Sequence, residues 1–297
     1  KMNILIEATG SLTSGYLIHA IQNANHRAIG SDIAEFGHGV SLCDDFIIMP
    51  KASDTDLWSK VIRLLIEYEV DVVIPSLDET LLGWSKRKEE LKKKGITVVL
   101  SNSNTLDIFM DKFKAFQFCN AHDILTPRTS LKQEYKLVKP RFGRGGSGVY
   151  IGNQKKDMKG MISQDLINGI EYTVDCFFDK NGDPIYIVPR KRMDIRDGKS
   201  TKGLVVEHCL IHDCVKHIAD NIKFEGLINF QFIESDDGAL YFLEVNPRIA
   251  GGMALGFAAT ENWIDLIVDN YINNKEVIAK PIQYGLRMTR YYSECFI

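Results

Sequence analysis

Short apolar runs alternate with segments of helical spacing along the first hundred residues. Apolar runs occur in "NILIEA", "RAIGSD", "DDFIIMP", "DVVIPS" and "ITVVL". Helical spacing is found in "SGYLIHAIQNA", and further helices are expected over about 57–68 and 79–94. Buried strands that alternate with helices are typical of a parallel sheet with helices on its faces. We therefore predict an α/β domain of Rossmann-like type over residues 1–103.

The pattern changes after about residue 102. One helix is expected over 105–121, and Pro127 stops any continuation. Strands then follow in "YKLVKP", "GVYIG", "EYTVDCFFD", "PIYIVPRKR", "INFQFIES" and "ALYFLEVN". The turn signals "DKNGDP" and "SDDGA" lie between strand pairs and are typical of antiparallel hairpins. The pattern predicts an α+β body over residues 104–297 behind the α/β domain.

Composition and charge exclude several classes of protein. The 297 residues carry 36 Lys and Arg against 39 Asp and Glu, a net charge of −3, which argues against a general nucleic-acid binder. No apolar run approaches the roughly 18 residues of a membrane helix. The chain enters a strand pattern at once, so no signal peptide is expected. The six cysteines include no C-x-x-C pair, as in reduced cytoplasmic proteins. We expect a cytoplasmic protein without nucleic-acid or membrane partners.

A glycine-rich stretch, "VKPRFGRGGSGV" at 138–149, combines four glycines with three cations and is typical of a loop that binds an anion. It is not a P-loop, because Lys139 precedes the glycines instead of following them. It is not a dinucleotide fingerprint either, because a strand pattern follows it. The turn "EATGSLTSGY", with Gly10 and Gly15, completes neither motif and is interpreted as a tight strand-to-helix turn rather than a cofactor site.

Polar residues interrupt the apolar strands "INFQF" and "LYFLEVNPR". A hairpin turn at 236–238 places Gln231 and Glu244 on neighbouring strands, and Glu244 and Asn246 point to one face because they are two residues apart. Carboxylate and amide oxygens suit magnesium, and an unpaired carboxylate within an apolar run would be costly. The pattern favours a magnesium site with Arg248 beside whatever the metal holds.

Two further segments contain groups that suit a nucleotide. An extended stretch from Gln164 to Ile167 could offer backbone groups to an adenine edge, and Glu171 could accept ribose hydroxyls, although a plain strand edge is the alternative. Lys112 lies in the first turn of a helix that Asp111 is expected to cap, where a cation opposes the helix dipole and suggests a bound anion.

Basic and thiol-containing segments remain. In "VPRKRMDIRDGKSTKG", alternation puts Arg190 and Arg192 on one face and Lys191 on the other; Arg190 and Lys202 are the candidates for substrate contact, and a solvated basic loop is the alternative. The set His208, Cys209, His212 and Cys214 matches no structural zinc spacing and is interpreted as part of an amphipathic helix.

In this order, the pieces resemble the ATP-grasp superfamily over essentially the whole chain. The resemblance is to the branch of the carbamoyl phosphate synthetase large subunit, with D-alanine–D-alanine ligase and the pyrrolysine-biosynthetic ligase as relatives. It implies a pre-ATP-grasp domain at 1–103 and an ATP-grasp body at 104–297, with a small lobe at 104–165 that carries a glycine lid and a large lobe at 166–297 that carries the metal site.

The resemblance also implies a role for each candidate residue. Lys112 and Lys139 would hold the α- and β-phosphates of ATP. The lid that closes over the β- and γ-phosphates would comprise Gly143, Arg144, Gly145, Gly146, Ser147 and Gly148. Adenine would lie against Gln164, Asp165, Leu166 and Ile167, and ribose against Glu171. Gln231, Glu244 and Asn246 would hold Mg²⁺, or alternatively Mn²⁺, although Gln231 stands where many relatives have an acid. Arg248, Arg190 and Lys202 would be catalytic.

The implied reaction joins a small-molecule acid to an amine through an acyl phosphate, with an amino acid, peptide or sugar acid as the acid substrate and a homodimer left open. A binding-only regulatory module of the same fold is the first alternative. A thiol acceptor or carbamate chemistry is the second. A Rossmann oxidoreductase is the third, and the incomplete glycine turn at Gly10 and Gly15 counts against it.

Overall fold

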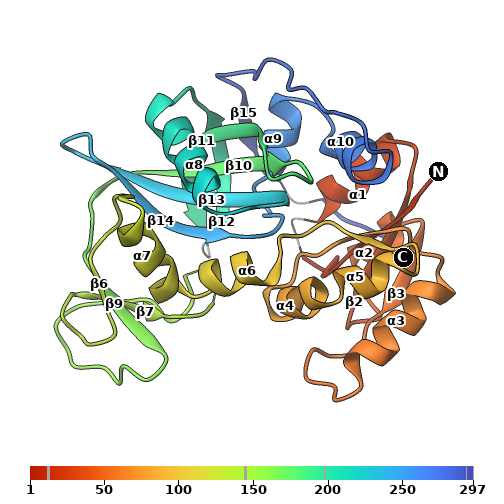
Figure 1. Ribbon diagram of the computed structural model, residues 1–297, viewed down its shortest axis with the longest axis horizontal. Coiled ribbons are helices and arrows are strands. Elements are labelled where there is room, and N and C mark those ends of the chain that lie inside the picture. Colours follow the sequence, from red (N-terminus) through yellow and green to blue (C-terminus); the bar gives the residue numbers. More distant parts are fainter. Residues whose placement is uncertain (12–13, 144–145, 197–198, 292, 297) are drawn as a thin grey trace.

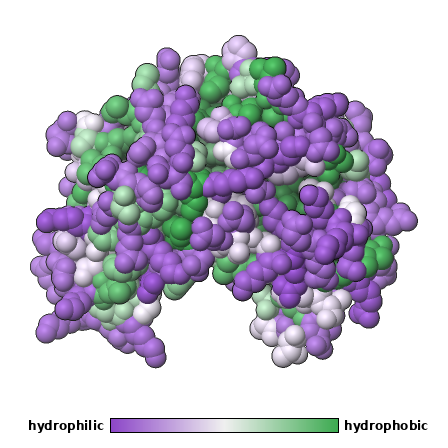
Figure 2. Space-filling view, in the orientation of Figure 1, coloured by the Kyte–Doolittle hydropathy of each residue, from purple (hydrophilic) through white to green (hydrophobic). Residues whose placement is uncertain are grey.

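The computed structural model describes residues 1–11, 14–143, 146–196, 199–291 and 293–296. Figure 1 shows three groups of strands: a large sheet along the top, a small sheet at lower left and the N-terminal sheet at lower right. In Figure 2, hydrophilic residues dominate this face, and a broad notch at its lower edge separates the part that holds the small sheet from the N-terminal part. The molecule is therefore arched.

The N-terminal sheet is parallel, as predicted. Its strands are β1 (Asn3–Ile6), β2 (Arg27–Asp32), β3 (Asp45–Ile48), β4 (Val72–Ile74) and β5 (Thr97–Val98), in the order β3-β2-β1-β4-β5. The chain order reverses between β1 and β4, so the crevice outside their carboxyl ends is where ligands of such sheets bind.

Helices cover both faces of this sheet. α1 (Gly15–Asn23) packs on one face with Ile4 and Ile6. α3 (Leu57–Glu67), α4 (Asp78–Lys86) and α5 (Lys88–Lys92) pack on the other face, and the short α2 (His38–Leu42) lies between β2 and β3. The single helix expected over 79–94 is therefore wrong. Arg87 separates α4 from α5 with φ −106° and ψ 2°, and its guanidinium turns back to the Gly83 carbonyl and the Trp58 ring.

The helix expected over 105–121 is also two helices, α6 (Ser103–Phe109) and α7 (Lys112–Ala121). The break is at Asp111, which caps α7 as predicted by accepting hydrogen bonds from the backbone N–H groups of Phe113 and Lys114. The same carboxylate binds the Arg141 guanidinium through two contacts of 2.7 and 2.6 Å. Asp111 thereby ties the start of α7 to the glycine-rich segment.

The small sheet comprises β6 (Thr129–Ser130), β7 (Leu137–Pro140), β8 (Tyr150–Ile151) and β9 (Met161–Gln164), in the order β6-β9-β7-β8. Every pairing in it is antiparallel. The glycine-rich segment joins β7 to β8, which confirms that it connects two strands. The loop is therefore carried by a small sheet rather than by a helix.

The large sheet is antiparallel, in the order β14-β13-β10-β11-β12-β15. Its strands are β10 (Gly169–Phe178), β11 (Pro184–Arg196), β12 (Lys199–Val205), β13 (Gly226–Ser235), β14 (Leu240–Asn246) and β15 (Arg287–Thr289). Both predicted hairpins, β10–β11 and β13–β14, are confirmed. α8 (Cys209–Asn221) covers one face, and α9 (Ala254–Ala259), α10 (Trp263–Ile267) and the π-helical turn η1 (Val268–Ile272) cover the other.

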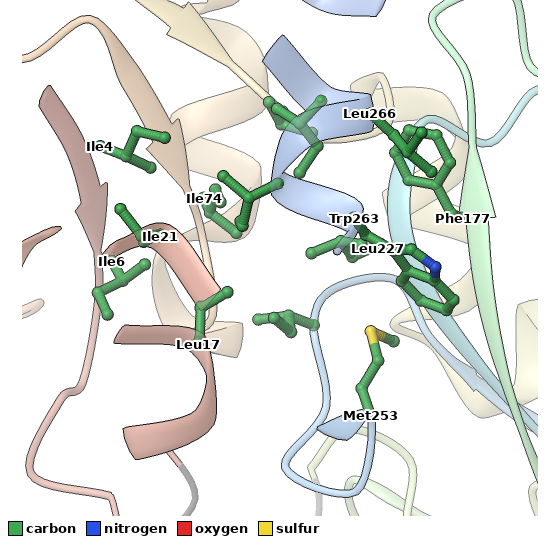
Figure 3. Packing of buried hydrophobic residues seen from close by; sticks show 14 of the residues in the cluster. Ile4, Ile6, Leu17, Ile21, Ile74, Phe177, Leu227, Met253, Trp263 and Leu266 are labelled. Atoms are coloured by element: carbon green, nitrogen blue, oxygen red, sulfur yellow. The ribbon is translucent and has the colours of Figure 1, made fainter. Parts of the chain in front are cut away.

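One apolar core joins the N-terminal sheet to the large sheet. Figure 3 shows Ile6 and Leu17 of the N-terminal part facing Met253, Trp263 and Phe177 of the large sheet and its helices. These side chains are almost fully buried, and such burial contributes about 25 cal/mol per Å² of apolar surface. The core therefore fixes where the two parts meet. Within the described part of the chain, no helix is long and apolar enough to cross a membrane.

A buried carboxylate, Glu7, organises the junction of β1, β4 and α4. Its Oε1 accepts hydrogen bonds from Trp84 Nε1 (2.8 Å) and Thr80 Oγ1 (2.9 Å). Its Oε2 accepts from the backbone N–H groups of Ser76 (3.0 Å) and Leu77 (3.3 Å). Burial raises the pKa of Glu7, and the four hydrogen bonds oppose that rise. The turn that leads into α4 is therefore built around this side chain.

We predict that Glu7→Ala lowers the free energy of unfolding by about 3 kcal/mol, because two buried and two partly buried donors lose their acceptor. Urea denaturation at pH 7 measures the change, and Glu67→Ala, at an exposed position of α3, is the control. The difference from wild type should shrink as pH rises above 4.5, because a carboxyl whose folded-state pKa is raised contributes most stability when it is protonated. Equal unfolding midpoints for Glu7→Ala and Glu67→Ala would contradict this role.

Candidate active site

A cavity of about 770 Å³ lies where the three sheets meet. Most of the residues singled out in the sequence line it, although they come from separate elements. They are Lys112, Lys139, Gly143, Gly146, Ser147, Glu171, Arg190, Gln231, Glu244, Asn246 and Arg248. The carboxyl ends of β1 and β4 contribute Glu7, Ser76 and Leu77 to the same cavity. The fold thus brings the predicted residues together at the switch point of the N-terminal sheet.

Two lysines and one carboxylate lie at the end of the cavity beneath the glycine loop. Lys112 Nζ donates a hydrogen bond to the Gly143 carbonyl (2.8 Å) and lies 3.7 Å from Glu244 Oε2. Burial lowers the pKa of Lys139; the Glu244 carboxylate opposes this effect and the Lys112 cation adds to it. Two cations thus share one carboxylate, and this end of the cavity carries excess positive charge. Such a region suits a polyanion.

The loop between β7 and β8 needs glycine for backbone reasons. Gly146 and Gly148 have φ values of 70° and 75°, and Gly143 has φ 125°, all in the left-handed region that other residues rarely adopt. A Cβ at Gly148 would lie 2.9 Å from Pro140 Cγ. Gly143, Gly146 and Ser147 line the cavity, whereas the predicted Arg144 and Gly145 lie outside the described residues. The described glycines of this loop therefore place no side chain between their backbone and the cavity.

The register of β13 and β14 assembles the oxygen-bearing side chains. Gln231 pairs with Glu244, and Asn229 pairs with Asn246. All four line the cavity, so the hairpin presents one carboxylate and three amides to a single surface. Hard oxygen donors of this kind fit a magnesium ion that also takes phosphate and water ligands. The donor set therefore fits Mg²⁺, although the described residues contain no cluster of three or more His, Cys, Asp or Glu.

A hydrogen-bonded chain crosses the floor of the cavity. Arg248 Nη2 lies 3.4 Å from Asn246 Oδ1, and Asn246 Nδ2 lies 3.5 Å from Asn229 Oδ1. Asn229 Nδ2 donates to Asp175 Oδ1 (2.8 Å), and Asp175 accepts from Arg190 Nε (2.8 Å) and Nη2 (3.2 Å). Arg190 and Asp175 are buried, so the charge of each is compensated by the other. Arg190 is therefore held rigidly at the cavity wall.

Other cations of β11 and β12 differ in what they face. Arg190 and Arg192 line the cavity, and Arg192 Nη1 donates to Glu171 Oε2 (3.0 Å). Lys191, between them, lies over the Tyr172 ring, 5.9 Å from its centre. Alternation along the strand therefore separates these cations as predicted. Lys202 is exposed on β12 and is not among the residues that line the cavity, so its contact with substrate stays a prediction.

The stretch predicted to contact adenine begins at Gln164, the last residue of β9. Gln164 is buried and donates to Thr129 Oγ1, and Asp165 pairs with Arg128. Leu166 is exposed, and none of the residues Gln164, Asp165, Leu166 and Ile167 lines the cavity. The reason is that β9 pairs with both β6 and β7, which commits Gln164 to the small sheet.

Two other motifs have structural roles in the described residues. The His208 side chain accepts a hydrogen bond from the backbone N–H of Ile211 and so caps α8, the helix that includes Cys209, His212 and Cys214. At the first glycine turn, the backbone N–H of Gly10 donates to Asp32 Oδ2 at the end of β2 (2.9 Å). The carboxylate at the end of β2 is thus engaged by the turn itself.

Sequence reasoning missed several residues that line the cavity or bind the residues that line it. Asp175 and Asn229 interrupt buried strands, and the cost of burying them unpaired was a signal that could have been used. Tyr16, whose hydroxyl donates to the Ala250 carbonyl, and Arg290, which donates through Nη2 to the Gly251 carbonyl, gave no such signal. Asp78 was missed too: its carboxylate accepts from Arg248 Nε (2.5 Å) and Nη2 (3.2 Å). These contacts join segments far apart in the chain.

Family models match two parts of the chain. Residues 157–293 match the family described as ATP-grasp in the biosynthetic pathway with Ter operon, and residues 4–99 match the PylC-like N-terminal domain. Among curated proteins, the arginine-specific carbamoyl phosphate synthase large chain of Bacillus subtilis is 24% identical over 195 residues, which is 54% of this chain and 18% of that protein. The chain therefore spans about a fifth of the length of the curated relatives it matches.

Solved structures share the fold at low identity. The biotin carboxylase domain of 2-oxoglutarate carboxylase from Hydrogenobacter thermophilus, in complex with MgADP, ADP and bicarbonate, superposes with a TM-score of 0.75 at 15% identity, over 97% of this chain and 74% of that one. The L-amino acid ligase of Bacillus licheniformis gives a TM-score of 0.72 at 16% identity, over 91% and 74% of the two chains. The predicted resemblance is thereby confirmed. Residues 157–293 match an ATP-grasp family model, and residues 4–99 match the PylC-like N-terminal domain.

Proposed function

We propose that this protein is an ATP-dependent ligase that joins the carboxylate of a small-molecule acid to an amine through an acyl phosphate. One observation carries the proposal: two lysines, a glycine loop and a set of oxygen donors, drawn from two sheets and a helix, meet in one cavity. The related structures, one with MgADP and bicarbonate and one of an L-amino acid ligase, support the same class of chemistry.

The nucleotide would lie between the small sheet and the large sheet. Lys112 and Lys139 would neutralise phosphate oxygens, which relieves the unfavourable proximity of the two cations. Backbone N–H groups of the loop at 143–148 would approach the terminal phosphates, and the loop would act as a lid of a small lobe (104–165) over a large lobe (166–297). Leu137 and Leu243 offer apolar surface to the base, and Glu171, which also lines the cavity, would accept the ribose hydroxyls.

Glu244, Asn246 and Gln231 would hold a divalent ion, Mg²⁺ or Mn²⁺, which when bound supplies charge neutralisation for the phosphates. The single carboxylate favours one tightly held ion over two. Two metal ions are usually bridged by a pair of carboxylates. At this hairpin Glu244 is paired with the neutral Gln231, so only one carboxylate is present for a second ion.

Phosphoryl transfer would begin when a carboxylate oxygen of the acid attacks the γ-phosphorus, and the bond to the β-phosphate oxygen breaks to release ADP. Arg248 would face the charge that develops on the transferring group, since its guanidinium lies beside Asn246 and lines the cavity. The amine then attacks the acyl carbon of the acyl phosphate, inorganic phosphate leaves, and the nitrogen loses a proton. The lid would keep water from the acyl phosphate in the interval.

A panel of acids and amines tests this proposal. ADP release should require both an acid and an amine, and hydroxylamine in place of the amine should trap the acyl phosphate as a hydroxamate. The panel includes bicarbonate, which tests carbamate chemistry, and a thiol acceptor. ATP binding without acid-dependent ADP release anywhere in the panel would instead favour a regulatory ATP-binding module.

Lys139 should contribute strongly to nucleotide affinity. We predict that Lys139→Met weakens the binding of MgAMP-PNP by about 10- to 100-fold, the loss expected when a charged donor to phosphate is removed. Titration calorimetry measures the change. The matched control is Lys136→Met, which removes an exposed lysine just before β7 and should leave the affinity unchanged within twofold. Equal affinities of the two variants would contradict the assignment.

Gln231 and Glu244 form a matched pair for testing the metal site, since each faces the other across the hairpin. In the presence of ADP, Glu244→Gln should weaken Mn²⁺ binding by about tenfold or more, because it removes the only carboxylate of the proposed set. Gln231→Glu should tighten Mn²⁺ binding, because it adds a second one. Electron paramagnetic resonance measures free Mn²⁺, and Glu276→Gln, at an exposed position, is the control. The assignment fails if neither variant differs from the control.

A further inference from the structure

A residue of the N-terminal domain binds the Arg248 guanidinium. Asp78, the first residue of α4, accepts hydrogen bonds from Arg248 Nε at 2.5 Å and from Nη2 at 3.2 Å, one to each carboxylate oxygen. The two residues are 170 positions apart. Bidentate pairing of this kind fixes both the position and the plane of a guanidinium. The N-terminal domain therefore determines how Arg248 is presented to the cavity.

The remaining contacts of Arg248 are weaker. Nη1 donates to the Ile249 carbonyl at 3.1 Å, and Nη2 lies 3.4 Å from Asn246 Oδ1. Both of these acceptors are neutral. The arginine side chain is 10% exposed and that of Asp78 is 24% exposed, so water competes little for the pair. Asp78 is thus the group that holds the guanidinium in one orientation.

The position of Asp78 is itself tightly fixed. The residue directly before it, Leu77, donates its backbone N–H to Glu7, and so does Ser76. Thr80 and Trp84, farther along α4, bond to the same carboxylate. The start of α4 is therefore anchored at the carboxyl end of β1, and its first carboxylate points at Arg248. The docking of the two domains does not depend on this ion pair, because the shared apolar core already joins them.

Resting on the proposed function, we propose that Asp78 is a positioning residue: through Arg248, the PylC-like N-terminal domain orients the charge that stabilises phosphoryl transfer. An arginine that must turn toward a transient charge loses part of its effect to reorganisation, whereas one already aimed does not. Small misplacements of such groups can cost about a hundredfold in rate. Asp78 acts on the transferring group only, and it has no part in holding the nucleotide.

Titration calorimetry with MgADP, with and without aluminium fluoride, tests this inference without a known acid. Aluminium fluoride mimics the transferring phosphoryl group, so it should tighten the binding of MgADP to the wild-type protein. Asp78→Asn should lose about tenfold or more of this tightening and keep the affinity for MgADP alone within twofold. Asp78→Glu, which keeps the carboxylate, should recover part of it. Glu79→Gln, which removes an exposed carboxylate from the same helical turn, is the matched control and should behave as wild type.

Arg248→Gln should show the same loss as Asp78→Asn, and the double variant should lose no more than Arg248→Gln alone, because both substitutions remove one function. The inference would be contradicted if the losses of the two single variants added up in the double variant. It would also be contradicted if aluminium fluoride tightened MgADP binding equally in Asp78→Asn and wild type, or in neither. Absence of any MgADP binding to the wild-type protein would contradict the proposed function, and the inference with it. Retained MgADP affinity also shows that each variant is folded.

Discussion

The cavity depends on the antiparallel register of β13 and β14. Because Gln231 faces Glu244 and Asn229 faces Asn246, one hairpin delivers all of its oxygen-bearing side chains to one surface. If one strand shifted by one residue, its oxygen-bearing side chains would turn toward the opposite face of the sheet. On that face, aromatic residues such as Phe230 and Phe232 form the core. Both faces of the hairpin therefore favour this register. On one face the aromatic residues must be buried, and on the other the polar residues must find partners. Placement of the proposed metal-binding groups is thus a consequence of core packing.

Polar partners extend this constraint outward to both domains. On one side, Asn246 and Asn229 connect Arg248 by hydrogen bonds to Asp175, and Asp175 in turn binds Arg190. On the other side, Arg248 binds Asp78 of the N-terminal domain. In a buried network of this kind each member satisfies its neighbour, so the loss of one leaves another unpaired. The apolar core shared by α1, α10 and the large sheet sets the spacing between the domains that this network needs. Core and network therefore specify the same arrangement of domains.

Local patterns in the sequence were enough to predict the sheets and much of the cavity. The parallel N-terminal sheet, the two hairpins and the cap at Asp111 follow from periodicity and turn chemistry, which act over a few residues. The predicted cations and oxygen donors gather because strand alternation decides their faces. What could not be predicted depends on contacts between distant segments. Asp78 meets Arg248, and Glu7 meets Trp84, only after the domains have folded. The pairing of Gln164 with β6 could not be predicted either, because it is not visible in the composition of the stretch itself.

Five cationic side chains of the cavity divide into two classes, and this division bears on how the protein would work. Arg190, Arg192 and Arg248 are each paired with a carboxylate: Asp175, Glu171 and Asp78 respectively. Such pairing costs mobility but fixes direction, which suits groups that must already point at a developing charge. Lys112 and Lys139 instead share Glu244, and Lys112 binds a neutral carbonyl of the glycine loop. A neutral partner is given up easily when phosphate arrives, and a cation that takes Glu244 as a ligand would release both lysines together. The lysines are therefore suited to capture the polyanion, and the arginines to act on it once it is bound.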